Sequence, residues 1–167
     1  GRLKEYAPFS FTTEETGGII GNGDITMDWI VHVLKRTVDT QYRTKADRRH
    51  TFLAGSSMGG LMTLYGLLAY PEVFSRGAAL SPSLWIDAEK VKAMIRHARV
   101  KRNTVLYMDY GALEFADHPH SRSLFAEVSA LLIEKRVLLN SRIVPRGTHC
   151  EASWEKQIPF FMKTLFE

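Results

Sequence analysis

The chain has 167 residues, of which 45% are hydrophobic, and its 22 Lys and Arg against 18 Asp and Glu leave a net charge of +4. This length and composition predict one domain with a hydrophobic core, and the modest, dispersed charge argues against a nucleic-acid partner. A single cysteine, Cys150, excludes an internal disulfide, the histidines show no metal-binding spacing, and no apolar run reaches the ~20 residues that cross a membrane.

The first quarter of the chain predicts a surface loop followed by one helix. Residues 1–24 are punctuated by Pro and Gly, which favours an irregular loop. From Asp24 or Thr26, either of which can cap a helix, apolar residues recur at helical spacing to about residue 40. A solvated, basic connection over residues 43–49 then leads to the central part of the chain.

Strands and helices alternate through the rest of the chain. Four short apolar segments predict buried strands, namely residues 52–54, 77–80, 104–108 and 141–144. Apolar residues at helical spacing predict helices over residues 61–70, 87–97 with Asp87 as the cap, 119–135, and from 153 onward. This alternation favours right-handed βαβ units and a parallel sheet with helices on both faces. Ligands of such sheets gather at the carboxyl ends of the strands.

One motif lies where the first of these strands meets its helix. Residues 51–60 read TFLAGSSMGG and fit the pattern G-x-S-x-G at Gly55, Ser57 and Gly59. This pattern is typical of a serine held on a strained turn with its hydroxyl exposed, where side chains at both glycines would crowd the turn. The helix that follows makes the backbone N–H of Met58 a natural oxyanion donor. A glycine-rich turn that only packs the helix against the sheet is the alternative.

A nucleophilic serine needs a base and a carboxylate that fixes the base. Histidine suits the first role because its pKa lies near neutrality, and His149 follows the last predicted strand. The order Ser, acid, His is that of α/β-hydrolases. Three candidate acids, Asp109, Glu114 and Asp117, follow the third strand. Asp109 could instead bind backbone N–H groups and Asp117 could cap a helix, so position favours Glu114, which follows a glycine turn.

Several motifs taken together carry a family resemblance. They are GSSMGG at 55–60, YPEVF at 70–74, SPSLW at 81–85, YMDYGALE at 107–114 and GTHCEASW at 147–154, with RLKEYAP at 2–8 and YRT at 42–44 upstream. In these segments the chain resembles the putative-esterase family of α/β-hydrolases. That family includes enterochelin-esterase-like, feruloyl-esterase-like and S-formylglutathione-hydrolase-like enzymes. The combination indicates the family but no particular substrate.

The resemblance assigns roles to individual residues. It implies that Ser57 is the nucleophile, His149 the base and Glu114 the acid, the last from a G-x-x-E segment after the third strand. It also implies that Trp85 and Trp154 lie near the substrate pocket, although packing of helix starts would explain both tryptophans equally well. This chemistry requires no metal and no cofactor.

The resemblance also predicts what the fold lacks. Family members carry several strands before the segment that is similar to residues 2–8, including the loop with the second oxyanion N–H. We therefore expect residues 1–167 to form a single α/β-hydrolase domain, the C-terminal two-thirds of the usual three-layer sandwich, with a mostly parallel sheet truncated at its N-terminal side. The nucleophile strand would then lie near an open sheet edge, covered by a homodimer or another chain unless the sequence is a fragment. Loss of one oxyanion donor would lower the rate by about 10²–10³.

These expectations define a function. We expect a serine hydrolase that cleaves a small-molecule carboxylic ester through an acyl-enzyme, with no nucleic-acid or membrane partner. An acyltransferase on the same triad and a non-catalytic, hydrolase-derived binding domain are the alternatives. An aryl or sugar-linked ester, a siderophore lactone and a thioester all remain open as substrates. The first residues carry no signal-peptide pattern, although the chain begins with Gly rather than Met, and we expect a cytoplasmic protein.

Overall fold

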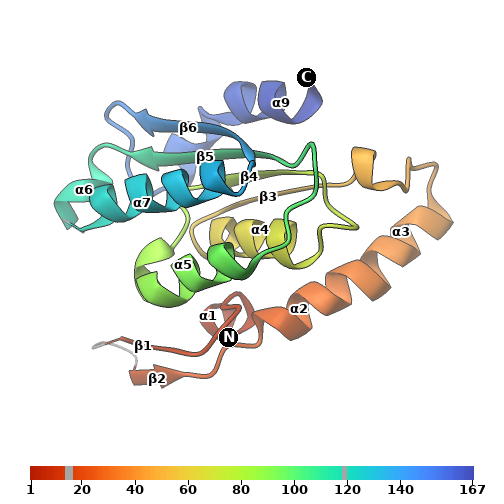
Figure 1. Ribbon diagram of the computed structural model, residues 1–167, viewed down its shortest axis with the longest axis horizontal. Helices are drawn as coiled ribbons and strands as arrows, with labels where there is room; N and C mark the ends of the chain where they lie inside the picture. The colour runs from red at the N-terminus through yellow and green to blue at the C-terminus, as the bar shows by residue number, and fades with distance from the viewer. Residues whose placement is uncertain (14–16, 118–119) are drawn as a thin grey trace.

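The centre of the fold is a parallel sheet of four strands in the order β3-β4-β5-β6 (Figure 1). The structure is a computed structural model that describes residues 1–13, 17–117 and 120–167, without the side chain of Asp117. The strands are β3 (Phe52–Ser56), β4 (Arg76–Leu80), β5 (Val105–Gly111) and β6 (Leu138–Val144). The predicted parallel sheet is therefore confirmed.

Helices cover both faces of the sheet, which gives three layers (Figure 1). One face carries α4 (Met58–Ala69), α5 (Ala88–His97) and α7 (Ser121–Glu134), and the other carries α9 (Ile158–Phe166). Successive side chains of β5 supply both cores because they point to opposite faces. Leu106 and Met108 are buried in the larger apolar cluster, whereas Tyr107 is buried with Leu165 in the second. This is the expected α/β-hydrolase-type sandwich.

The ends of several elements differ from the sequence-based expectation. The Asp87 side chain accepts a hydrogen bond from Lys90 N, so the predicted cap of α5 is confirmed. β5 continues to Gly111, three residues beyond the predicted end, because its backbone stays paired with β6. The predicted final helix is two helices, α8 (Glu151–Glu155) and α9, since Pro159 lacks the N–H that a continuous helix needs.

The N-terminal segment is more regular than the predicted loop. It contains the short helix α1 (Arg2–Glu5) and an antiparallel pair, β1 (Phe11–Thr13) and β2 (Gly17–Ile19). Phe11 is buried in the main core, and Ala7 accepts a hydrogen bond from Gly23 N at 2.7 Å. The segment is therefore ordered by tertiary contacts, which a local pattern of Pro and Gly does not report.

The helix predicted from Asp24 or Thr26 begins earlier and contains a wider turn. It runs through α2 (Gly23–Trp29), a π-helical turn η1 (Ile30–Leu34) and α3 (Lys35–Gln41). The predicted caps are wrong, because Asn22 precedes the first helical residue. Met27 and Val31 are buried as expected, but Leu34 is 42% exposed. The π turn inserts an extra residue and so rotates the later positions away from the core.

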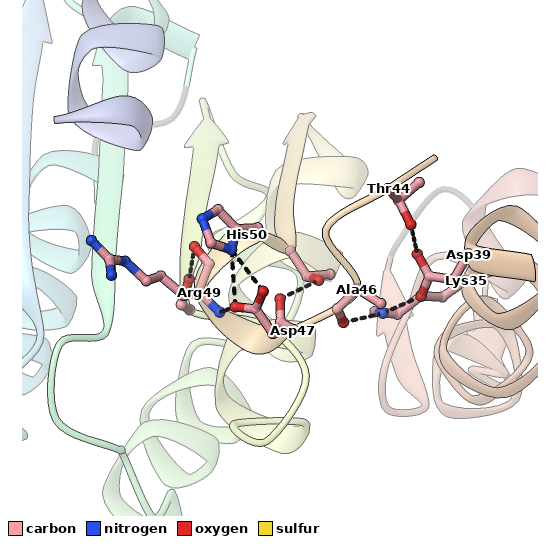
Figure 2. A network of polar contacts seen from close by, with 9 residues as sticks. Lys35, Asp39, Thr44, Ala46, Asp47, Arg49 and His50 are labelled. Atoms are coloured by element: carbon pink, nitrogen blue, oxygen red, sulfur yellow. Dashed lines mark hydrogen bonds and ion pairs between the residues drawn. The ribbon is translucent and has the colours of Figure 1, made fainter. Parts of the chain in front are cut away.

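The basic connection of residues 43–49, between α3 and β3, is fastened by side chains of α3 and by Asp47 (Figure 2). Asp39 accepts a hydrogen bond from Thr44 Oγ1 at 2.6 Å, and Lys35 Nζ donates to Ala46 O at 2.8 Å. Asp47 then caps the 3₁₀ turn η2 (Arg48–His50) through the backbone N–H of Arg49. The connection is exposed and enters β3 with a defined backbone path.

β3, the strand that leads to Ser57, lies at one edge of the sheet. Within the described residues it pairs with β4 alone, so the expectation of an open edge beside the nucleophile strand is confirmed. The homodimer that would cover this edge stays a prediction. None of the described helices combines the length and apolar character needed to cross a membrane.

Candidate active site

Ser57 occupies a sharp turn between β3 and α4. Its backbone has φ 57° and ψ −123°, a left-handed conformation that is costly for a residue with a Cβ. The turn is fixed to the next strand because Ser57 N donates to Leu80 O at 2.9 Å. The strained backbone raises the serine above the carboxyl end of β3 and leaves it partly exposed.

The glycines around Ser57 do not play equal parts. A Cβ at Gly55 would lie 2.5 Å from Gly59 O, and one at Gly60 would lie 3.0 Å from Leu80 O. A Cβ at Gly59 would meet no described atom within 4 Å. The expectation that a side chain at 59 would crowd the turn is therefore wrong. Helix α4 packs against the sheet at Gly60 instead, one residue further on.

The backbone around Met58 suits an oxyanion. Met58 is the first residue of α4, so its N–H has no acceptor within the helix and lies at the positive end of the helix dipole. Its side chain is buried in the main core, which fixes the direction of the helix start. This N–H follows Ser57 directly in the chain.

Ser57, His149 and Glu114 form a continuous line of hydrogen bonds. His149 Nε2 lies 2.9 Å from Ser57 Oγ, and His149 Nδ1 lies 2.7 Å from Glu114 Oε2. An ionised carboxylate only accepts, so Nδ1 carries the proton and Nε2 can accept from the Ser57 hydroxyl. The three residues follow β3, β5 and β6, and parallel strands bring their carboxyl ends to one edge.

The Glu114 carboxylate is held ionised although it is buried. Glu114 is 4% exposed and is the first residue of the short helix α6 (Glu114–Asp117). Oε1 accepts hydrogen bonds from Gly111 N at 2.8 Å and from Ser81 Oγ at 2.7 Å. Burial alone would raise the pKa of Glu114, but the hydrogen bonds from His149, Ser81 and Gly111 outweigh it and lower the pKa.

Asp109, another candidate acid, does not share this position. Asp109 is 1% exposed, and its carboxylate accepts from Ser81 N at 3.1 Å and from Tyr107 OH at 2.8 Å. It thus fastens the backbone, which was the alternative expected for it. The pKa of Asp109 is raised, chiefly because burial disfavours the charged form of the carboxyl. The side chain of Asp117 lies outside the described residues.

The loops that carry Glu114 and His149 contact each other at Gly111 and Gly147, and the sequence did not predict this contact. A Cβ at Gly111 would lie 2.4 Å from Gly147 O. Leu113 N donates to Gly147 O at 3.0 Å. This backbone contact sets the distance between acid and base. The only sequence signal is a glycine in each of the two candidate loops.

The two predicted pocket tryptophans have different surroundings. Trp154 Nε1 donates to Ser81 Oγ at 3.0 Å, and the indole meets the His149 ring edge-on at 5.0 Å. Trp154 also borders an open hollow of about 330 Å³ that is lined mainly by β3, α8 and α9. Trp85 lies in the 3₁₀ turn η3 (Leu84–Ile86) and is 42% exposed. Its place near the substrate stays a prediction, as does that of Trp154.

Two serines beside the candidate triad were also missed. Ser83 Oγ lies 3.4 Å from Ser57 Oγ, and Ser81 binds both Glu114 and Trp154. Both belong to the segment SPSLW, whose position just after β4 was the available signal. Among the residues that the structure describes, no group of three or more His, Cys, Asp or Glu side chains could hold a metal ion.

A parallel sheet with helices on both faces and a serine on a strained turn after β3 defines the α/β-hydrolase class. The family model described as Putative esterase matches residues 21–162. This match covers most of the chain, and the chain therefore belongs to that family.

Individual relatives agree with this fold. The iron(III) salmochelin esterase of Escherichia coli O6:H1 (strain CFT073) is 35% identical over 78 residues, which are 46% of this chain and 19% of that protein. An IroE-like serine hydrolase from Shewanella oneidensis superposes on 98% of this chain and 55% of its own, with TM-score 0.78 and 19% identity. The enterobactin esterase from Shigella flexneri superposes on 86% of this chain and 38% of its own, with TM-score 0.65 and 25% identity. The chain thus spans less than two thirds of the length of each.

Proposed function

We propose that this chain is a serine hydrolase that cleaves carboxylic esters through Ser57, His149 and Glu114. The observation that carries the proposal is the line of hydrogen bonds from Ser57 Oγ through His149 to Glu114 Oε2, at 2.9 and 2.7 Å. These distances lie within the reach that a nucleophile, its base and the acid require. Membership of the esterase family supports the same reaction class.

The first half of the reaction forms an acyl-enzyme. As Ser57 Oγ attacks the ester carbonyl carbon, His149 Nε2 takes the hydroxyl proton. The carbonyl oxygen becomes an oxyanion, which the backbone N–H of Met58 stabilises by a hydrogen bond. Glu114 keeps the Nδ1 proton of His149 in place and stabilises the imidazolium by its charge. The ester C–O bond then breaks, and His149 passes its proton to the leaving alcohol.

The second half releases the acyl group. A water molecule gives a proton to His149 Nε2 while its oxygen attacks the acyl carbon, and the Met58 N–H stabilises the second oxyanion. The bond to Ser57 Oγ breaks, the proton returns to this oxygen, and a carboxylic acid leaves. His149 is 41% exposed, so solvent water reaches the base directly. This exposure favours hydrolysis over acyl transfer to a second alcohol.

The test is turnover by the chain and by Ser57→Ala. We expect the chain to hydrolyse p-nitrophenyl acetate, with salmochelin and enterobactin as the next substrates because relatives are named as esterases of these compounds. Ser57→Ala should lose turnover and labelling by a fluorophosphonate probe, and Ser129→Ala, at a half-buried serine of α7, should keep both. A chain that neither turns over nor reacts with the probe would be a binding domain. A competing alcohol that captures the acyl group would indicate a transferase.

A further inference from the structure

Ser57 and Ser81 occupy equivalent positions after neighbouring strands. Ser56 and Leu80 are paired in the parallel register of β3 and β4, so each serine is the next residue after a paired position. Both have positive φ, 57° for Ser57 and 41° for Ser81. A residue with a Cβ is strained in this region and glycine is not. The serine side chain at 81 therefore calls for a role that offsets its backbone strain.

The Ser81 hydroxyl lies between Trp154 and Glu114. Ser81 is 2% exposed, so water does not compete for its hydrogen bonds. Trp154 Nε1 can only donate, and it donates to Ser81 Oγ at 3.0 Å. The hydroxyl proton is then directed to the acceptor on the other side, Glu114 Oε1 at 2.7 Å. The hydrogen bonds thus run in one direction, from the indole to the carboxylate.

Trp154 also contacts the other partner of Glu114. Its ring meets the His149 imidazole edge-on, with centroids 5.0 Å apart and planes at 85°. The His149 loop is fastened to the helix of Trp154, because Thr148 N donates to Ser153 Oγ at 3.1 Å. One tryptophan therefore limits the rotation of the imidazole and, through Ser81, the orientation of the carboxylate.

We infer that Trp154 and Ser81 are positioning residues that act through Glu114. The Trp154 N–H orients the Ser81 hydroxyl, and the hydroxyl holds Glu114 Oε1, so that Oε2 stays aimed at His149 Nδ1. The two hydrogen bonds also favour the charged form of the carboxylate. This role rests on the proposed function, and it is separate from substrate contact by Trp154.

The first test compares three variants by steady-state kinetics with p-nitrophenyl acetate. Ser81→Ala removes the hydroxyl, and we expect kcat to fall about 10- to 100-fold with little change in KM. Ser81→Gly removes the same hydroxyl and relieves the positive φ, so it should fold at least as well and be equally impaired. Trp154→Phe keeps a ring but loses the N–H, and kcat should fall about 3- to 10-fold. Recovery of kcat in Ser81→Gly would overturn the inference.

The matched controls are Ser129→Ala and Trp29→Phe, which change a hydroxyl and an indole away from Glu114 and should leave kcat unchanged. A double-mutant cycle then tests whether Trp154 acts through Ser81. If it does, Trp154→Phe has little further effect on kcat in the Ser81→Ala background. If the double variant instead lost kcat by the product of the two single losses, Trp154 would not act through Ser81.

A second readout does not depend on turnover. The pKa of Glu114, followed by ¹³C NMR of its side-chain carboxyl, should rise in Ser81→Ala because one hydrogen bond to the charged form is lost. It should stay unchanged in Ser129→Ala. An unchanged pKa in Ser81→Ala would overturn the inference even in a chain without turnover. If the unmodified chain showed no turnover but the pKa of Glu114 still rose in Ser81→Ala, only the proposed function would be overturned.

Discussion

Gly111 and Gly147 touch backbone to backbone, and this contact joins the loop of the candidate acid to the loop of the candidate base. A Cβ at Gly111 would lie 2.4 Å from Gly147 O and 2.5 Å from Glu114 Oε1. Neither atom belongs to a flexible side-chain end that could move without cost, because Glu114 is held by Ser81 and His149. The separation of Glu114 and His149 therefore depends on the absence of a side chain at 111.

We expect Gly111→Ala to lower both stability and turnover. The added methyl must push the two loops apart, which costs about 1–3 kcal/mol of the free energy of unfolding and lengthens the contact between Glu114 and His149. Urea unfolding and p-nitrophenyl acetate hydrolysis measure the two effects. Gly18→Ala is the control, since a Cβ there meets no described atom within 4 Å. Equal behaviour of the two variants would show that the glycine contact does not set the site.

The two glycines of the G-x-S-x-G pattern should respond in opposite ways. Gly55→Ala brings a Cβ to 2.5 Å from Gly59 O and should displace Ser57, with loss of turnover. Gly59→Ala has space and lies in the first turn of α4, where it should raise the free energy of unfolding by up to about 1 kcal/mol and keep turnover. Urea unfolding measures the stability of both variants, and p-nitrophenyl acetate hydrolysis measures their turnover. Equal loss of activity would contradict this asymmetry.

The sheet and the positions of Ser57 and His149 were predictable because their signals are local. Apolar runs mark β3 to β6, and the carboxyl ends of parallel strands meet at one edge wherever the crossovers run. For the acid, position alone only favoured Glu114, and the family resemblance then assigned it, because the spacing of residues does not show which carboxylate meets the imidazole. Asp109 accepts hydrogen bonds from Tyr107 OH and Ser81 N, whereas Glu114 binds His149.

What the sequence did not predict depends on contacts between distant segments. Ser81 and Trp154 are 73 residues apart, and no local pattern reports their hydrogen bond. The order of the N-terminal segment has the same origin, since Phe11 is buried against elements far along the chain. The π turn of η1 is also invisible in the spacing of apolar residues, and it is the reason why Leu34 faces solvent.

Glu114→Gln should leave the fold intact and nearly abolish turnover. The amide oxygen can still accept from Ser81 and Gly111, but the amide N–H₂ then faces His149 Nδ1 and favours the tautomer with its proton on Nε2. That tautomer cannot accept the proton of Ser57, and we expect kcat to fall by about 10⁴. Glu134→Gln, exposed at the end of α7, is the matched control. A loss of less than tenfold would remove Glu114 from the role of the acid.

Glu114→Gln also tests how the stability of the fold depends on pH. The folded protein holds the pKa of Glu114 below its ordinary value of 4.5, so its charged form stabilises the fold above that value. This contribution is lost as the pH falls through the lowered pKa of the folded state. The difference in unfolding free energy between the protein and Glu114→Gln should therefore be constant near neutrality and shrink in acid. Urea unfolding at a series of pH values measures it, and a difference that grows in acid would contradict the assignment.

Asp109 should show the opposite dependence. Burial raises its pKa in the folded state above the ordinary value of 3.8, so the carboxyl favours folding most at pH values below 3.8. That contribution is lost as the pH rises through the raised folded pKa, because the charged form is costly in a site that is 1% exposed. Asp109→Asn keeps an oxygen for Ser81 N and cannot ionise. Its stability relative to the unmodified protein should therefore increase from acid to neutral pH. Urea unfolding of both proteins across this range tests the sign, and a relative stability that falls toward neutrality would mean that the Asp109 carboxylate is held charged.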